Sequence, residues 1–252
     1  MSDRVLVAFE GGVLTATLNR PEKKNAIDTP MIDALLTLLE RADLDGAVRV
    51  VAVRGAGGDF CAGMDLNELL ASADKSVEEN RRAALQFAEI FVRMRRLPKP
   101  IVAVVQGRAL AGGCGLATAC DLVLATESAS FGYPEVQRGF VPAIVMTLLK
   151  RSAGEKVAFD LAATGRILGA PEAAGLGLVS RVYEDSDFED QVSEVLRALA
   201  GASPSALAFT KQQFYQLDGL RFEDGIRLGA DVNAVSRTTP DFRAALQAFL
   251  KK

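Results

Sequence analysis

The sequence predicts an α/β fold with parallel strands, and three observations support this class. Short strands alternate with amphipathic helices through the first half of the chain, several of these strands are continuously apolar, and two of them end in glycine-rich segments. Continuous apolar strands are typical of parallel sheets, because helices cover both faces of such a sheet. With 252 residues, 49% of them hydrophobic, the chain can bury a large core.

The first elements are a hairpin and a helix. Strands are expected over residues 5–9 and 13–18, joined by the turn residues Glu10-Gly11-Gly12. Thr29-Pro30 is typical of a helix start, with threonine as the cap and proline in the first turn. Apolar residues at helical spacing then extend this helix to about Leu44.

The remaining elements continue the alternation and then become helical. Strands are expected over 48–53, 101–105 and 122–125, a long helix over 78–96, and a short helix near 112–119. From Pro142 onward the pattern is nearly all helical. Gly201-Ala202-Ser203-Pro204 is the best boundary, which divides the chain into a core over residues 1–200 and a C-terminal helical region over 201–252.

Composition restricts the classes of function. The net charge of −3 provides no broad basic field for nucleic acid, and no apolar run approaches the roughly 20 residues that span a bilayer. The start of the chain has no signal-peptide pattern, and the three cysteines form no CxxC pair. We therefore expect a cytoplasmic protein with reduced thiols and neither a membrane nor a nucleic-acid partner.

The absence of histidine is the most informative count. It excludes Ser-His-Asp and Cys-His catalysis, histidine bases and histidine-bearing metal sites, and we expect no metal. Carboxylates are therefore the leading candidates for acid–base chemistry.

Two glycine-rich loops follow buried strands, over residues 58–66 and 107–117. Glycine lets the backbone approach a ligand closely, and the second loop leads into a helix whose free N–H groups favour negative charge. One N–H group from each loop could meet at a single carbonyl oxygen. The loops contain neither G-x-G-x-x-G nor a P-loop, and simple tight turns are the alternative interpretation.

A third element is Ser130-Phe131-Gly132-Tyr133-Pro134-Glu135-Val136, which places a lone glutamate in an apolar stretch. On its own, Glu135 would be a surface residue or half of an ion pair. Together, however, the elements resemble the crotonase (enoyl-CoA hydratase/isomerase) superfamily across nearly the whole chain. The matching motifs are N-R-P-x-x-x-N-A at 19–26, F-C-A-G-x-D-L at 60–66, P-K-P-x-x-A-x-x-x-G at 98–107, A-L-x-G-G-x-x-L-A-x-x-C-D at 109–121 and F-G-x-P-E at 131–135.

The resemblance implies a fold and an assembly. The family fold is an α/β spiral of ββα units with a C-terminal helical region that builds trimers, which often pair into hexamers. We expect a homotrimer or homohexamer that acts on an acyl-CoA thioester in fatty acid metabolism. No cofactor is expected, because coenzyme A is part of the substrate.

The resemblance also implies site residues. By motif position, the N–H groups of Met64 and Gly112 form an oxyanion hole, and Glu135 is the catalytic carboxylate. The remaining positions are expected to contact the substrate or its CoA moiety: Lys24, Ala26, Ala62, Asp65, Leu66, Gly113, Gly115 and Pro134.

Gly115 is the main departure from the family pattern, because the family's hydratases carry a second catalytic glutamate at this position. The separation of twenty residues between Gly115 and Glu135 is the usual one, so the alignment holds. Glycine is expected to leave room for a bulkier or branched acyl group. Asp65 and Glu68 are replacement carboxylates by loop proximity only, and a helix-start role is the alternative for Asp65.

Three functions follow from these observations. The leading one is an enoyl-CoA hydratase, a lyase. The single glutamate favours a Δ3,Δ2-enoyl-CoA isomerase as the alternative. A non-catalytic acyl-CoA-binding protein is the third, and Glu135 opposes it, since a binding protein needs no such carboxylate.

Overall fold

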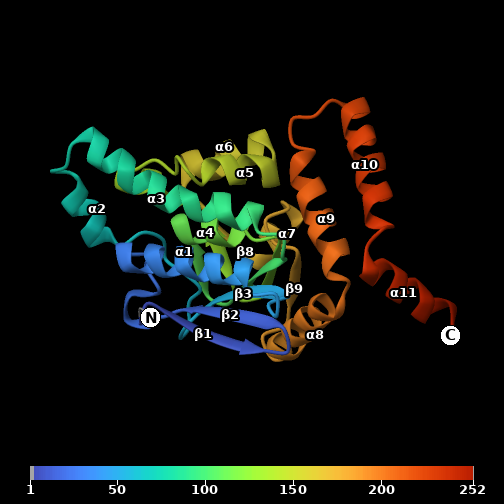
Figure 1. Cartoon of the computed structure of the whole chain (residues 1–252). Coiled ribbons are helices and arrows are strands. Elements are labelled where there is room, and N and C mark those ends of the chain that lie inside the picture. Colours follow the sequence, from blue (N-terminus) through green and yellow to red (C-terminus); the bar gives the residue numbers. More distant parts are fainter. Residues whose placement is uncertain (1–2, 252) are drawn as a thin grey trace.

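The computed structural model describes residues 3–251, in which helices pack against two sheets and the β1–β2 hairpin lies at the edge of the molecule (Figure 1). The six-stranded sheet has the order β1-β2-β3-β4-β6-β9, and the three-stranded sheet has the order β5-β7-β8. The strands are β1 (Val5–Glu10), β2 (Val13–Leu18), β3 (Val50–Gly55), β4 (Ile101–Val105), β5 (Arg108–Leu110), β6 (Leu122–Thr126), β7 (Ser130–Gly132), β8 (Ile167–Gly169) and β9 (Arg181–Tyr183). The helices are η1 (Pro21–Lys23), α1 (Thr29–Leu44), α2 (Leu66–Ser72), α3 (Val77–Arg96), α4 (Gly112–Thr118), η2 (Pro134–Arg138), α5 (Met146–Ala153), α6 (Glu155–Thr164), α7 (Ala170–Gly175), α8 (Phe188–Gly201), α9 (Pro204–Gln216), α10 (Phe222–Ser236) and α11 (Pro240–Leu250).

The predicted strand pairing is confirmed. β1 and β2 form the antiparallel hairpin, and β2, β3, β4, β6 and β9 pair in parallel. Two boundaries differ from the sequence prediction. β3 begins at Val50 because Val48 still belongs to a turn in which its N–H donates to the carbonyl of Asp45. The α1 cap is Asp28 rather than Thr29, since the Asp28 carboxylate accepts from the N–H of Met31.

The chain winds as a spiral, and successive turns contribute one strand to each sheet. β4 joins the large sheet and β5 the small one, and β6 and β7 repeat this step. The prediction of a nearly all-helical chain after Pro142 was wrong at β8 and β9. These strands contain three residues each, too few to produce an alternating pattern.

The central strands of the large sheet bury both of their faces. Along β3, Val51 and Val53 belong to the main core with α1 and α3. Val50 and Ala52 point to the other face, where the apolar side of α8 covers the sheet. Both faces of each central strand are therefore apolar, as the continuous hydrophobic runs indicate.

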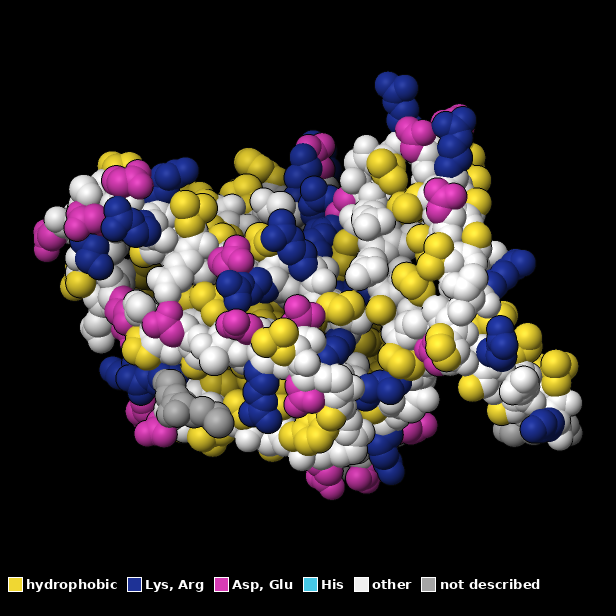
Figure 2. Space-filling model, viewed as in Figure 1, with side chains coloured by type: hydrophobic (Ala, Val, Ile, Leu, Met, Phe, Trp, Pro, Cys, Tyr) yellow, Lys and Arg dark blue, Asp and Glu magenta, His cyan; other side chains and the backbone are white. Residues whose placement is uncertain are grey.

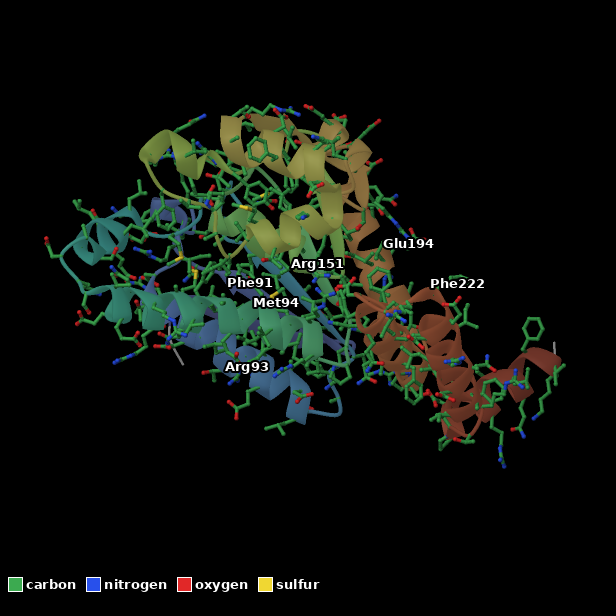
Figure 3. All side chains as sticks on the ribbon, turned by 90° about the horizontal axis from the view of Figure 1, so that it is seen from above. Phe91, Arg93, Met94, Arg151, Glu194 and Phe222 are labelled. Atoms are coloured by element: carbon green, nitrogen blue, oxygen red, sulfur yellow. The ribbon has the colours of Figure 1, made fainter. Side chains whose placement is uncertain are left out.

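Helix α3 shows the complementary helical pattern. Phe91 and Met94 lie on one side of this helix and Arg93 on the other (Figure 3). Both apolar side chains belong to the main core, whereas Arg93 pairs with Glu89 on the surface. Ser76 and Glu79 form a reciprocal capping box at the start of the helix.

The C-terminal helices extend away from the spiral core (Figure 1). α8 ends at Gly201 and α9 begins at Pro204. A buried polar cluster fixes α9 to the core: the ammonium group of Lys211 pairs with Asp121 at 2.7 Å and donates to the carbonyls of Met94 and Lys99, both at 2.9 Å. The hydroxyl of Tyr215 donates to the same aspartate at 2.7 Å.

No helix within residues 3–251 is both long and apolar enough to cross a membrane. No group of three or more metal-ligating side chains among these residues is placed to hold a metal ion.

Candidate active site

The loop after β3 is held on both sides by backbone hydrogen bonds. On one side, the N–H of Ile27 donates to the carbonyl of Gly63, and the N–H of Asp65 donates to the carbonyl of Ile27, both at 2.8 Å. On the other side, Cys61 exchanges two bonds of 2.9 Å with Arg108 and Leu110. This loop therefore behaves as a short strand between two neighbours, and its backbone direction is strongly determined.

The second glycine-rich loop carries backbone strain directly before α4. Ala111 has φ +51° and ψ −127°, a conformation that non-glycine residues rarely adopt. The N–H of Ala111 donates to the carbonyl of Gly132 at 2.8 Å, which anchors the strained residue to β7. Because ψ of Ala111 orients the following peptide, the strained torsion sets the direction of the Gly112 N–H group.

The two loops meet at close range. A Cβ atom built on Gly63, which has φ +96°, would lie 2.8 Å from Cβ of Ala111 and 3.3 Å from the nitrogen of Gly112. A Cβ atom built on Gly113 would lie 2.3 Å from the carbonyl oxygen of Cys61. Only glycine permits this approach of the two backbones.

Met64 and Gly112 both present unused N–H groups at this junction. Neither group donates to an acceptor anywhere within residues 3–251. A Cβ atom on Gly112 would lie 3.7 Å from Cγ of Met64, so the two residues are neighbours. Two adjacent free N–H groups can hold a carbonyl oxygen that acquires negative charge.

Glu135 follows β7 and lies in the first turn of η2. Only 7% of its surface is exposed, and within the described residues its Oε2 atom is buried without a hydrogen-bond partner. Burial raises the pKa of this carboxyl group, while its own backbone N–H and Arg138 oppose the rise. A buried carboxylate with a raised pKa can both accept and return a proton near neutral pH.

Thiol and phenol chemistry is disfavoured beside Glu135. Burial raises the pKa of Cys114 to about 11, and the charge of Glu135 contributes to this rise. Burial also raises the pKa of Tyr133 well above its ordinary value, and its hydroxyl lies 2.9 Å from that of Thr118. Both groups stay protonated at neutral pH.

Asp65 is part of a buried ion network. Its carboxylate pairs with Arg20 at 2.8 Å and accepts from the N–H of Asn67 at 2.8 Å, which caps α2. Arg20 also pairs with Asp28 at 3.3 Å. Burial alone would raise the pKa of Asp65, but the bonds from Arg20 and Asn67 lower it overall. The side chain of Asp65 is thus committed to the helix-start role.

Glu68 is engaged in the same way and is not oriented as a replacement carboxylate. Its two oxygens accept from the backbone N–H of Thr29 at 3.1 Å, and one of them also accepts from the threonine hydroxyl at 2.9 Å. Neither acidic residue suggested by loop proximity has a carboxylate left unpaired.

Gly115 corrects one sequence-based expectation. The missing side chain leaves no room for an acyl group, because Val145 occupies the space. A Cβ atom on Gly115 would lie 2.1 Å from Cγ1 of Val145 and 2.7 Å from its Cβ atom. Sequence reasoning missed Val145, which lies at the start of α5 and carries no motif signal.

The other predicted contact residues surround the two loops. Lys24 is exposed, and its carbonyl accepts from the N–H of Ala62 at 2.9 Å. The pKa of Asp59 is lowered mainly by its hydrogen bond from Arg108, and the charge of Lys24 adds to this effect. Ala26 is half-buried and Leu66 is 60% exposed. Gly113 and Pro134 are buried beside Gly112 and Glu135.

The chain is similar to known proteins along nearly its whole length. The family model described as "Enoyl-CoA hydratase/isomerase" matches residues 8–252. A Thermus thermophilus protein provisionally named an enoyl-CoA hydratase is 41% identical over 243 residues, 96% of each chain. The 1,2-epoxyphenylacetyl-CoA isomerase of Escherichia coli is 32% identical over 254 residues, 100% of this chain and 97% of that protein. The crystal structure of an enoyl-CoA hydratase from Mycobacterium smegmatis superposes with a TM-score of 0.94 at 31% identity, and the match covers 99% of this chain and 97% of that one.

These matches define an α/β enzyme with the crotonase fold, as the sequence motifs predict. The chain belongs to the enoyl-CoA hydratase/isomerase family. Its relatives include hydratases and an isomerase, and a hydratase-type function is supported.

Proposed function

We propose that this enzyme carries out a hydratase-type reaction on an enoyl-CoA thioester, with Glu135 as its acid–base group. The carrying observation is the buried carboxylate of Glu135, whose Oε2 atom has no hydrogen-bond partner among the described residues, on a segment that the bond from Ala111 to Gly132 joins to the Gly112 loop. Burying an unpaired carboxylate is costly, which argues for a catalytic use and against a simple binding protein.

In this proposal the N–H groups of Met64 and Gly112 bind the thioester oxygen. They stabilise the negative charge that develops there when water adds at C3 of a 2-enoyl thioester. Glu135 takes a proton from the attacking water and returns it to C2. One donor in an oxyanion hole typically contributes about 10²–10³ in rate, and general acid–base catalysis about 10²–10⁴.

Isomerisation of a 3-enoyl thioester is the second candidate. It is favoured because Gly115 supplies no second carboxylate, and because Asp65 and Glu68 have other partners. The relative from Escherichia coli named as an isomerase acts on a CoA thioester by its name, which supports the same substrate class here.

The CoA moiety is proposed to lie along the outer side of the two loops. Lys24 and Leu66 are exposed there, and the half-buried Ala26 and Ala62 lie beside them. Asp65 would contribute through its backbone, since its carboxylate is occupied. Gly113 and Pro134 would border the acyl end. No cofactor is proposed apart from the CoA of the substrate.

We further propose a homotrimer or homohexamer assembled through the C-terminal helices. Apolar side chains lie along the outer surface of this region (Figure 2). The most exposed of them are Phe214, Phe222, Ile226, Phe249 and Leu250. A surface of this kind usually marks an interface. Sedimentation at micromolar concentration should give a trimer or a hexamer, and a monomer would contradict the assembly.

The cellular setting is inferred from composition. Three buried free thiols support a reducing cytoplasmic location, and a net charge of −3 gives no support for nucleic-acid or membrane partners. A place in fatty acid metabolism follows from the proposed substrate class.

The reaction itself is tested with a panel of CoA thioesters. Purified protein is incubated with 2-enoyl and 3-enoyl thioesters of several chain lengths, and products are identified by mass spectrometry and NMR. We expect a 3-hydroxyacyl thioester from a 2-enoyl substrate, a 2-enoyl thioester from a 3-enoyl substrate, or both. Recovery of every thioester unchanged, with CoA still bound, would contradict an enzymatic role.

A further inference from the structure

Val145 and Gly115 are sterically interdependent. Gly115 lies inside α4, and an added Cβ atom would fall 2.1 Å from Cγ1 and 2.7 Å from Cβ of Val145. Real Cβ contacts stay beyond 3.0 Å. Even alanine at position 115 would therefore collide with this side chain.

Val145 cannot relieve such a collision by changing rotamer. Rotation about χ1 moves Cγ1, but the Cβ atom at 2.7 Å is fixed by the backbone. That backbone is itself restrained, because the Val145 carbonyl accepts from the N–H groups of Leu148 and Leu149. The side chain is 3% exposed and belongs to the main core. The start of α5 would have to move.

The position of the valine matters for the chemistry proposed above. A side chain at position 115 would point toward Val145. The neighbouring Cys114 lies close enough to Glu135 for the charge of Glu135 to help raise the pKa of the thiol, after burial. A bound water needs two to four polar partners, and the valine methyl groups supply none. A side chain at position 115, where a second acid–base group would have to lie, would therefore meet an apolar group.

We propose that Val145 is a specificity-determining residue: it occupies the place of an acidic side chain at position 115 and presents an apolar wall that disfavours a bound water. The inference rests on the proposed function of Glu135. It deepens that function by naming what sets the balance of its two candidate reactions: the apolar wall slows water addition and leaves proton transfer within the thioester as a competing reaction.

The competing reaction is a proton shift that consumes no water. Glu135 takes a proton from C2 of a 3-enoyl thioester, so a C–H bond breaks and an enolate forms at the N–H groups of Met64 and Gly112. The double bond moves from C3–C4 to C2–C3, and Glu135 returns the proton to C4. No atom is gained or lost, and no redox partner is required.

The test uses paired substitutions with a matched control. The double variant Gly115→Glu/Val145→Gly removes the valine side chain and places a carboxylate at position 115. The control, Gly115→Gln/Val145→Gly, has nearly the same shape without the charge. For each protein, kcat/KM is measured for hydration of a 2-enoyl thioester and for isomerisation of a 3-enoyl thioester. We expect the ratio of hydration to isomerisation to be at least about tenfold higher in the glutamate variant than in its glutamine control. Equal ratios in the two proteins would overturn the inference.

Thermal midpoints test the steric half independently of activity. Gly115→Glu alone should be much less stable than the wild type, and Val145→Gly should restore part of that loss, which gives a non-additive double-mutant cycle. Additive effects, or a single Gly115→Glu variant as stable as the wild type, would show that Val145 does not occupy this space. If no thioester reacts with any protein, the proposed function fails, and the cycle still decides the steric claim.

A second variant keeps the chemical claim testable if the double variants do not fold. Val145→Thr has nearly the same shape and adds one hydroxyl group that can bind water. The ratio of hydration to isomerisation should rise in this variant. A ratio equal to or below that of the wild type would overturn the role of the apolar wall.

Discussion

The backbone half and the side-chain half of the candidate site are built in different ways. The loops that carry Met64 and Gly112 are fixed by hydrogen bonds on both sides, and glycines at 63 and 113 permit their contact. The side-chain half consists of one carboxylate, Glu135, whose Oε2 atom has no hydrogen-bond partner among the described residues, and of the apolar wall proposed for Val145. Several hydrogen bonds and close contacts thus hold the backbone half in place, whereas the chemistry depends on a single side chain. Substitutions in one half should therefore lower activity without disturbing the structure of the other half.

The largest effect should come from Glu135→Gln. The substitution keeps the shape and removes the only carboxylate proposed to move protons, so kcat should fall by about 10²–10⁴ while CoA binding persists. Because burial raises the pKa of Glu135, its charge opposes folding above its ordinary pKa of about 4.3. The thermal midpoint of the variant should thus exceed that of the wild type at pH 7, and the difference should shrink as the pH falls toward 4.

Glu68→Gln is the matched control for this prediction. Its carboxylate binds Thr29 rather than facing the loops, so turnover should stay near the wild-type value. An inactive Glu68→Gln protein together with an active Glu135→Gln protein would show that Glu68, and not Glu135, is the acid–base group.

The next largest effect concerns the backbone half. Gly112→Pro removes one N–H group and should lower kcat by about 10²–10³. Gly112→Ala keeps the N–H group, and its Cβ atom would lie 3.3 Å from the ring of Phe87, a tight contact at the edge of an aromatic side chain. The alanine variant should therefore retain far more activity than the proline variant when both have similar thermal midpoints. Full activity in a folded Gly112→Pro protein would refute the role of this N–H group.

Asp65→Asn should affect stability rather than chemistry. Removing one charge from this buried network leaves Arg20 paired with Asp28, so the free energy of unfolding should fall by less than the roughly 3–5 kcal/mol that breaking an isolated buried pair costs. Because the folded-state pKa of Asp65 is lowered, its contribution is present above about pH 4 and is lost as the pH falls further. Denaturant unfolding should show a large difference in the free energy of unfolding between the variant and the wild type at pH 7, and a small difference at pH 3. A loss of CoA affinity with unchanged stability would instead indicate a direct contact.

Lys24→Ala should give the smallest effect. The side chain is exposed, and exposed ion pairs contribute about 0–1 kcal/mol, so CoA affinity should fall by at most about fivefold at low salt. Titration calorimetry at two salt concentrations measures the change. An affinity identical to that of the wild type at low salt would remove the contact.

The segments that form the backbone half are visible in the sequence. The glycine-rich strand exits, their order and the proline before Glu135 are local signals, and the structure brings these segments together. The strained φ of Ala111 was not foreseen, because alanine gives no warning of a conformation imposed by the bond to Gly132. The cap at Asp28 was displaced by one residue, since Thr29 and Asp28 are both good capping residues.

The side-chain half was predicted only in part. The departure at Gly115 is visible in the sequence, but its consequence depends on a residue thirty positions later. Nothing local distinguishes Val145 from other apolar residues at the start of a helix. A tertiary contact of this kind produces no periodicity or motif in the sequence. The expectation that Gly115 leaves room for a branched acyl group was therefore wrong, because Val145 occupies that space.

The central claim, a site with one working carboxylate, is tested most directly by the pH dependence of kcat/KM. The account predicts a single rising limb with an apparent pKa above the ordinary value of about 4.3 for glutamate, followed by a plateau to about pH 9. Cys114 and Tyr133 should not disturb the plateau, since burial raises the pKa of the thiol to about 11 and that of the phenol well above its ordinary value. A bell-shaped profile with a second ionisation between about pH 5 and pH 9 would reveal a second acid–base group and contradict the claim.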